Sequence, residues 1–212
     1  MNAARVIEPE WLDELPHEDP RARRSRRDLA RVNALMGNVR IVAGALARLP
    51  ALASVAEIGA GDGAFMRAVL ARVDGPPAQV HLVDRQPLGT VTADVFDWLA
   101  DPPAARVDAI VANLFLHHFV AADVERMMTL IARRARVFVA CEPRRSFVAL
   151  AGSHLLGLVG CNDVTRHDAV VSVRAGFSGG ELSALWGAKH GWVVEERGRG
   201  LFSHVFVARR HD

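Results

Sequence analysis

The 212-residue chain contains no tyrosine, one lysine and only two cysteines, Cys141 and Cys161. The cysteines show no metal-ligand spacing and are too few for a disulfide framework in a chain of this length. Acidic and basic residues almost balance, so the formal net charge of +2 gives no general reason to expect nucleic acid or an anionic membrane as the main partner. We therefore expect a protein of the reducing cytoplasm that does not bind nucleic acid.

The chain also lacks a long hydrophobic run. Its N-terminus is acidic and shows no apolar segment of the kind found in signal peptides. The most apolar segment, residues 146–161, is short for a spanning helix and contains His154. We expect no stable membrane insertion. The arginine cluster at 21–27 fits a solvated helix face, and a basic amphipathic helix lying on a membrane surface stays open as an alternative.

Residues 1–50 carry apolar side chains at helical spacing from Leu29 onward, and Gly37 and Asn38 are expected to divide the segment into two helices. From residue 53, short apolar runs alternate with helical patterns, as in a doubly wound α/β sheet covered on both faces. Strands are expected at 54–58, 79–84, 90–94, 107–113 and 136–142, and helices at 63–73, 95–100, 121–135 and 145–159. We place a helical N-terminal cap at 1–50 and the main domain at 51–212.

The C-terminal part departs from this alternation. Ser178 stands three residues before Glu181, as in a capping box, so a helix is expected over 178–191. Two strands then flank a Gly-Arg-Gly turn within 192–210. Such a hairpin makes the last strand of the sheet antiparallel, which is unlike the usual dinucleotide dehydrogenase.

A glycine-rich turn follows the first apolar strand, with Gly59, Gly61 and Gly63 on alternate positions. Glycines let the backbone approach a ligand closely, but the pattern alone also nearly satisfies the dinucleotide fingerprint. The neighbouring acidic residues distinguish a dinucleotide from a ligand that carries positive charge. Glu57 at the end of the strand and Asp62 in the loop would repel a pyrophosphate and attract a ligand that carries an ammonium group and a sulfonium.

Two further carboxylates follow the next strands. Asp84 ends the second strand, where a carboxylate can accept both hydroxyl groups of a ribose. Asp94 follows the third strand, where its side chain and the backbone amide of Val95 could contact the edge of an adenine. Each acid alone also fits a helix cap or a surface charge. As a set they favour S-adenosylmethionine, an adenosine with a zwitterionic amino acid and a cationic sulfur, over NAD.

The sequence resembles class I S-adenosylmethionine-dependent methyltransferases over about residues 50–210. "VAEIGAGDGAF" is similar to the first motif of that family, "HLVD" to its ribose-binding acid and "DAIVANLFLHHF" to its fourth-strand motif. The resemblance implies a Rossmann-like, seven-stranded α/β sheet of order 3-2-1-4-5-7-6 with an antiparallel last strand, in agreement with the hairpin. It also implies that the cofactor is contacted by Glu57, Gly59, Ala60, Gly61, Asp84, Arg85, Asp94, Val95, Asn113 and Leu114.

A narrower resemblance concerns the acceptor. "RSRRDLARVNALMG", "LFLHHF" and "VTRHDAVVSVRAGFSGGEL" are similar to small bacterial methyltransferases of aromatic polyketide and phenolic-lipid pathways, which belong to secondary metabolism. This likeness implies a small hydrophobic or aromatic substrate and N-terminal helices that close the pocket, with Arg31 or Asn33 near the cofactor. Asn113 is followed by Leu-Phe-Leu instead of Pro-Pro-Tyr or Pro-Pro-Phe, which argues against methylation of a DNA adenine or a protein glutamine and leaves a hydroxyl, thiol or carbon acceptor.

Methyl transfer from a sulfonium is an in-line displacement, so the enzyme mainly has to align the nucleophile with the methyl group. A phenol must also lose a proton, and histidine is a suitable base near neutral pH. His117 and His167 are the candidate bases, with catalysis by proximity alone as a third option. Asp168 adjoins His167, but adjacent residues do not normally face each other, so no dyad is expected from that pair.

The candidate substrate-binding residues are His118, Arg144 and Arg145, although a histidine here could be structural and the arginines could cap a helix end. No metal is expected. We predict O-methylation of a phenolic, quinone-like or polyketide hydroxyl, with C-methylation of a similar ring as the nearest alternative. An NAD-dependent oxidoreductase and a non-catalytic or RNA-directed protein are the alternatives from other classes, and a homodimer is an option.

Overall fold

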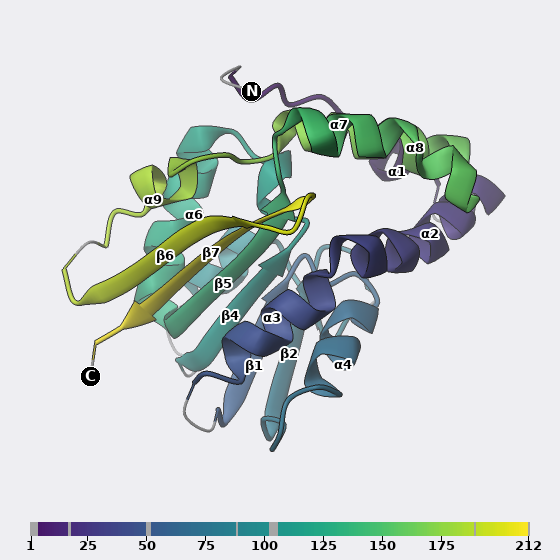
Figure 1. Ribbon diagram of the computed structural model, residues 1–212. Coiled ribbons are helices and arrows are strands. Elements are labelled where there is room, and N and C mark those ends of the chain that lie inside the picture. The colour runs from purple at the N-terminus through teal and green to yellow at the C-terminus, as the bar shows by residue number, and fades with distance from the viewer. Residues whose placement is uncertain are drawn as a thin grey trace.

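The computed structural model describes residues 4–16, 18–49, 52–87, 89–101, 106–188 and 190–211. Within these ranges the chain forms a seven-stranded sheet in the order β3-β2-β1-β4-β5-β7-β6 (Figure 1). The strands are β1 (Ser54–Ile58), β2 (Gln79–Asp84), β3 (Val91–Thr92), β4 (Val107–Asn113), β5 (Ala135–Pro143), β6 (Trp192–Arg199) and β7 (Ser203–Arg210). β7 pairs antiparallel with β5 and β6, and the other pairs are parallel. The predicted α/β class, strand order and antiparallel last strand are confirmed.

Helices cover both faces of this sheet (Figure 1). One face carries α3 (Asn38–Leu46) and α4 (Ala64–Leu70), and the other carries α5 (Val95–Ala100), α6 (Ala121–Arg134) and α9 (Glu181–Leu185). Alternate residues of β4 point to opposite faces, as the pleat requires, so that Val111 packs with the α3 and α4 side and Ile110 with the α6 side. Every residue of β1 is buried, as expected for a strand covered on both faces, and this includes the carboxylate of Glu57.

A further group of helices lies over the carboxyl ends of the parallel strands: α1 (Trp11–Glu14), α2 (Pro20–Met36), α7 (Phe147–His154) and α8 (Asp163–Ala175) (Figure 1). α8 packs against α1, α2 and α7. The chain before α1 is tied to the end of α8, because the backbone N–H of Val6 donates to the carbonyl of Arg174 over 3.2 Å. Ligands of open α/β sheets bind at this carboxyl edge, so the N-terminal residues lie over the expected site.

The expected break between the two long N-terminal helices is found at Gly37, which ends α2 with φ 72° in the left-handed region. α2 starts at Pro20 after a capping Asp19, whose Oδ1 accepts the backbone N–H of Arg21 over 2.8 Å. α3 buries Val42 and Leu46 in the same core as β1 and β4. α3 thus shares the core of the sheet, although it lies within the segment 1–50, whereas α1 and α2 pack on α8.

Two segments differ from the sequence-based expectation. The helix expected over 145–159 is α7, which ends at His154 and is followed by the 3₁₀ helix η2 (Leu156–Val159) and then by α8, where no helix was expected. α8 has a clear start, since Asn162 Oδ1 accepts the backbone N–H of Thr165 over 2.9 Å. The helix expected over 178–191 is limited to α9, because the chain becomes extended at Trp186, whose ring is buried. Among the helices of the described residues, none combines the length and apolar character that crossing a membrane requires.

Candidate active site

The glycine loop after β1 has the backbone that the sequence predicts. Gly59, Gly61 and Gly63 have φ values of 69°, 52° and 73°, which side chains of L-residues rarely adopt. A Cβ atom at Gly59 would lie 2.1 Å from Cδ2 of Phe115, which follows β4. Glycine at position 59 is therefore required by the conformation and by the close approach of Phe115, and Ala60 between the glycines is buried.

The two predicted adenosine-binding acids lie at the ends of β2 and β3. Asp84 Oδ2 accepts the backbone N–H of Gly61 over 2.8 Å, and its Oδ1 accepts that of Gln86 over 2.8 Å. Asp94 caps α5, since its Oδ1 accepts the N–H of Phe96 over 2.8 Å. Carboxylate oxygens have about two lone pairs each, so both groups can still accept a hydroxyl or amine donor. Arg85 is exposed beside Asp84, and Val95 is buried below Asp94.

Glu57 is buried at the carboxyl end of β1 with 2% of its surface exposed. Its Oε2 has no hydrogen-bond partner within the described residues. Burial raises the pKa of Glu57 to about 8. A hydrogen bond from the backbone amide of Met66 lowers this pKa, and the negative charges of Asp62 and Asp84 raise it further. A buried carboxyl with one unpaired oxygen beside two other acids fits a cationic ligand, because a nearby positive charge would stabilise its ionised form. The sulfonium and ammonium groups of S-adenosylmethionine meet that requirement, and a pyrophosphate does not.

Asn113 at the end of β4 joins the sheet to the N-terminal helices. Its Nδ2 donates to Asn33 Oδ1 over 3.1 Å, and Asn38 Nδ2 donates to Asn113 Oδ1 over 2.9 Å. The following Leu114 has φ 52° and donates its N–H to the carbonyl of Cys141 over 2.9 Å. A leucine with positive φ is a strained backbone position, and such strain is concentrated at functional sites. Asn33, which sequence analysis expected near the cofactor, thus contacts a predicted cofactor residue, whereas Arg31 pairs with Asp28 at 2.7 Å.

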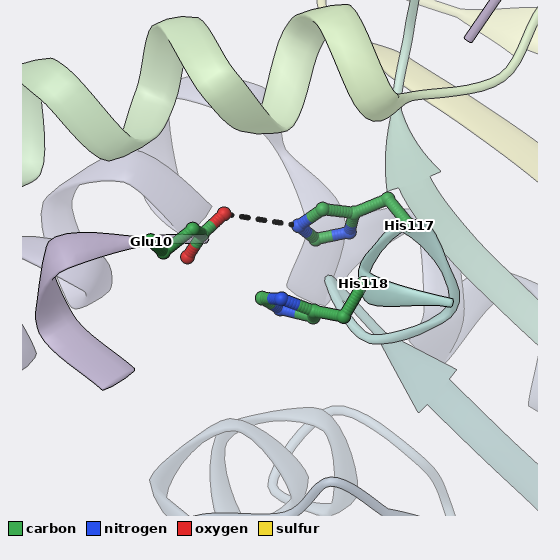
Figure 2. A group of neighbouring side chains, drawn as sticks. All are labelled: Glu10, His117 and His118. Carbon is green, nitrogen blue, oxygen red and sulfur yellow. Dashed lines mark ion pairs between the residues drawn. The ribbon is translucent and has the colours of Figure 1, made fainter. Parts of the chain in front are cut away.

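His117 lies in the 3₁₀ helix η1 (Leu116–His118) and is almost completely buried. Its Nδ1 is 2.8 Å from Glu142 Oε2, and its Nε2 is 3.4 Å from Glu10 Oε1 (Figure 2). Glu142 also accepts the backbone N–H groups of Phe115 and Leu116 over 3.1 and 2.9 Å. Burial alone would lower the pKa of His117, but the two carboxylates outweigh it and raise the pKa to about 9. The carboxylates therefore favour the protonated imidazole, and both ring nitrogens of His117 already face a carboxylate.

His118 lies beside His117, with ring centroids 4.2 Å apart and planes inclined at 33° (Figure 2). Its side chain is 31% exposed, and Nδ1 is 3.8 Å from Asp13 Oδ2. Burial, together with the positive charge of His117, lowers the pKa of His118 below its ordinary value. His118 is thus the neutral, accessible imidazole of the pair. The ligand atoms of Glu10, His117 and His118 lie within 4.8 Å of one another, close enough to hold a metal ion, but Glu10 and His117 are already paired with each other.

His167 lies on α8, where its ring stacks on Trp11 with centroids 3.8 Å apart. Its Nδ1 is 2.9 Å from Asp168 Oδ1, so the expectation that these neighbours do not face each other is wrong. The reason is that Asp168 turns toward the N-terminal segment, where it accepts the backbone N–H groups of Trp11 and Leu12 over 2.8 and 3.0 Å. His167 and Asp168 dock α1 onto α8, and within the described residues no hydrogen bond or ion pair joins them to His117 or His118.

The two arginines after β5 have different surroundings. Arg145 is buried, forms an ion pair with Glu181, and donates to Ser178 Oγ over 3.0 Å. Glu181 balances its charge inside the fold, so these contacts fit a structural role at the start of α9, and substrate binding by Arg145 stays a prediction. Arg144 is partly exposed and donates to the carbonyl of Gly200 over 3.2 Å.

Three residues that were not candidates from the sequence also shape this site. Glu142 and Glu10 hold His117 from opposite sides, and Arg5 donates to the carbonyls of His117 and Phe119 over 3.2 and 3.1 Å. Glu142 could have been found, because it ends the strand next to β4, and the ends of neighbouring parallel strands meet at one edge. Glu10 and Arg5 lie more than a hundred residues from η1 and carry no local signal.

No family model matches this sequence, and no curated protein matches it. Several solved structures are similar. The mitomycin 7-O-methyltransferase MmcR is 23% identical over 94% of this chain and 60% of its own, with a TM-score of 0.62. The plantazolicin methyltransferase BamL, solved with S-adenosylhomocysteine, is 12% identical over 93% of this chain and 92% of its own, with a TM-score of 0.65. Human N-acetylserotonin methyltransferase, solved with S-adenosylmethionine, is 13% identical over 94% of this chain and 61% of its own, with a TM-score of 0.57.

These identities are low, and the likeness concerns the fold. The chain has the fold of class I S-adenosylmethionine-dependent methyltransferases, as the sequence motifs predicted. It spans about 60% of the mitomycin and human enzymes and nearly the full length of BamL.

Proposed function

We propose that this protein is an S-adenosylmethionine-dependent methyltransferase that acts on a small-molecule acceptor. The observation that carries the proposal is the buried Glu57 carboxyl, unpaired at Oε2 and placed next to the glycine loop. A dehydrogenase would place a pyrophosphate beside this group and beside Asp62, where like charges repel. The motif set, the strand order and the similar methyltransferase structures support the same cofactor.

All the predicted cofactor residues except Arg85 receive a role. Glu57 would balance positive charge, Asp84 would accept ribose hydroxyls, and Asp94 with the amide of Val95 would meet the adenine edge. The glycines, with Ala60, allow the backbone to approach the ligand, and Asn113 and Leu114 hold the turn at the end of β4. When it is bound, S-adenosylmethionine supplies an electrophilic methyl group on a sulfonium.

The acceptor is proposed to be a hydroxyl group, with His118 as the group that receives its proton. His118 takes this role in place of His117 because its pKa is lowered and its side chain is accessible, whereas His117 is charged and held by two carboxylates. His117 then acts as a positioning residue, since its charge keeps the neighbouring imidazole neutral. His167 is assigned to the docking of α1 through Trp11.

An aromatic acceptor is supported by a group of phenylalanine rings from α5 and from both ends of η1. Phe115 and Phe119 meet edge to face with centroids 5.0 Å apart, and Phe96 meets Phe119 in the same way at 6.1 Å. Partly buried rings of this kind offer apolar faces to a flat ligand, either the adenine or the acceptor ring. The N-terminal segment before α3 is proposed to close the site from above, because Glu10 and Arg5 reach η1.

The test of the base is a comparison of His118→Gln with His167→Gln, each assayed with a phenolic acceptor. His118→Gln should lower kcat by about 10²–10⁴-fold, the usual contribution of a general base, and leave S-adenosylhomocysteine affinity unchanged. The loss should shrink as pH approaches the pKa of the phenol, because the acceptor then ionises unaided. Near-normal kcat for His118→Gln would overturn the assignment, and a carbon-methylated product would overturn O-methylation.

A further inference from the structure

A second polar cavity lies beside the proposed active site. It has a volume of about 440 Å³ and opens between the end of β5, the start of α9 and the β6–β7 hairpin. Its lining consists of Arg144, Arg145, Ser146, Ser178, Gly179, Arg197, Gly198 and His204. No carboxylate lines it in the part of the chain that the structure describes. The cavity is therefore surrounded by donors and positive charge.

The hydrogen bonds of the lining residues show which donors remain for a ligand. Ser146 Oγ accepts the N–H of Ala149, and Ser178 Oγ accepts from Arg145, so the proton of each hydroxyl is still available. The Arg144 guanidinium donates once, to the Gly200 carbonyl, and pairs with no carboxylate within the described residues. Arg197 reaches Glu195 only at 3.5 Å and is half exposed.

The nearby carboxylates are all engaged elsewhere. Glu181 pairs with Arg145 and accepts the N–H of Ser178 over 2.9 Å. Glu196 pairs with His204 at 2.7 Å and accepts the N–H groups of Leu182 and Ser183 over 3.0 and 2.7 Å. They neutralise Arg145 and hold His204. Arg197 points to the other face of β6, toward Glu195 and α3, so Arg144 is left as the unpaired charge that faces the cavity.

Gly198 makes room for the free guanidinium. A Cβ atom at this position would lie 2.8 Å from Cζ of Arg144 and 3.0 Å from its Nε. Residue 198 lies within the regular strand β6, and its φ is outside the left-handed region, so its backbone conformation does not call for glycine. The missing side chain instead lets Arg144 lie over the strand at the cavity wall.

We propose that this cavity binds a phosphate group. The Arg144 guanidinium and the hydroxyls of Ser146 and Ser178 around one volume can donate to several oxygens of a phosphate at once, which suits a tetrahedral anion better than a carboxylate. The cavity adjoins the carboxyl end of β5, next to the end of β4, and Figure 1 shows the turn between β6 and β7 at this same edge beneath α7 and α8. The assignment of this phosphate rests on the proposed function. The phosphate group belongs to the methyl acceptor, so the substrate is a phosphorylated small molecule.

The experiment titrates the full chain with inorganic phosphate, phenyl phosphate and acetate at constant ionic strength. Wild-type protein should bind both phosphates at one site and acetate more weakly. Arg144→Gln should weaken phosphate binding by about 10- to 100-fold, the range for hydrogen bonds to a charged group. Arg210→Gln, which makes the same charge change at the exposed end of β7, should leave phosphate affinity unchanged.

Gly198→Ala provides a second variant that keeps every charge and needs only a shift of the flexible Arg144 side chain. It should reduce phosphate affinity several-fold while the unfolding temperature stays near that of the wild type. Equal phosphate affinity in wild type, Arg144→Gln and Gly198→Ala would overturn the site, and acetate binding as tight as phosphate binding would overturn the ligand class. Titration with S-adenosylhomocysteine separates this proposal from the proposed function, since its failure would count against the methyltransferase and leave the phosphate site standing.

Discussion

Replacing Glu57 by glutamine should remove a pH dependence of folding stability that the wild-type protein shows. The pKa of Glu57 is about 8 in the folded protein, against an ordinary value of 4.5. Between these two pH values the unfolded chain is ionised while the folded protein keeps the proton. The folded state then binds more protons, so the free energy of unfolding falls as pH rises through this window and levels off above pH 8.

The size of the effect follows from the pKa difference. One pKa unit corresponds to about 1.4 kcal/mol, so the shift sets an upper limit of about 5 kcal/mol. Local relaxation and water penetration reduce such penalties, and we expect a loss of about 2–3 kcal/mol between pH 5 and 8. Glu57→Gln keeps the shape of the side chain and cannot ionise, so its stability should lack this component.

Urea unfolding at a series of pH values measures the difference directly. Glu125→Gln, a substitution of an exposed glutamate on α6, is the matched control and should keep the wild-type slope. Calorimetry of S-adenosylmethionine binding in buffers of different ionisation enthalpy gives a second readout. A cationic ligand should ionise Glu57, so wild-type protein should release close to one proton per cofactor near pH 7, and Glu57→Gln should release none. Equal slopes and equal proton release in wild type and Glu57→Gln would refute the reasoning.

Two further predictions concern the loop and the buried arginine. Gly59→Ala should abolish S-adenosylhomocysteine binding in a calorimetric titration and destabilise the protein more than Gly75→Ala does. Both positions have positive φ, but only a Cβ at Gly59 meets Phe115. Equal effects of the two substitutions would contradict the account of the loop. Arg145→Met should lower the free energy of urea unfolding by about 1–3 kcal/mol, because the hydrogen bonds of the buried guanidinium are lost while Glu181, which is 36% exposed, can be solvated. A stable Arg145→Met variant that loses acceptor binding would instead support the substrate role.

The strands could be predicted closely because they are buried on both faces, which leaves continuous apolar runs such as 107–113 with clear ends. The hairpin and its antiparallel strand followed from a single turn signal. α8 was missed because polar and apolar residues mix along it and its partners are α1, α2 and α7, which only the folded chain brings together. The start of α8 at Asn162 is a capping signal that could have been used.

The residues of the candidate site were likewise only partly predictable from the sequence. The residues of the glycine loop and the acids after β2 and β3 were predictable, since each follows a strand at the carboxyl edge. The role of His117 was not, because it depends on burial between Glu142 and Glu10, and Glu10 comes from a distant part of the chain. Charge state is set by such surroundings, so adjacent histidines with the same local sequence have pKa values shifted in opposite directions.

The central claim is tested most directly by calorimetric titration of the purified full chain with S-adenosylhomocysteine and, separately, with NAD. The account predicts one S-adenosylhomocysteine per chain, no NAD binding, and an affinity lowered by about 10- to 100-fold in Asp84→Ala, as expected when ribose hydroxyls lose a charged partner. NAD binding without S-adenosylhomocysteine binding, or an Asp84→Ala variant that binds S-adenosylhomocysteine like the wild type, would contradict it.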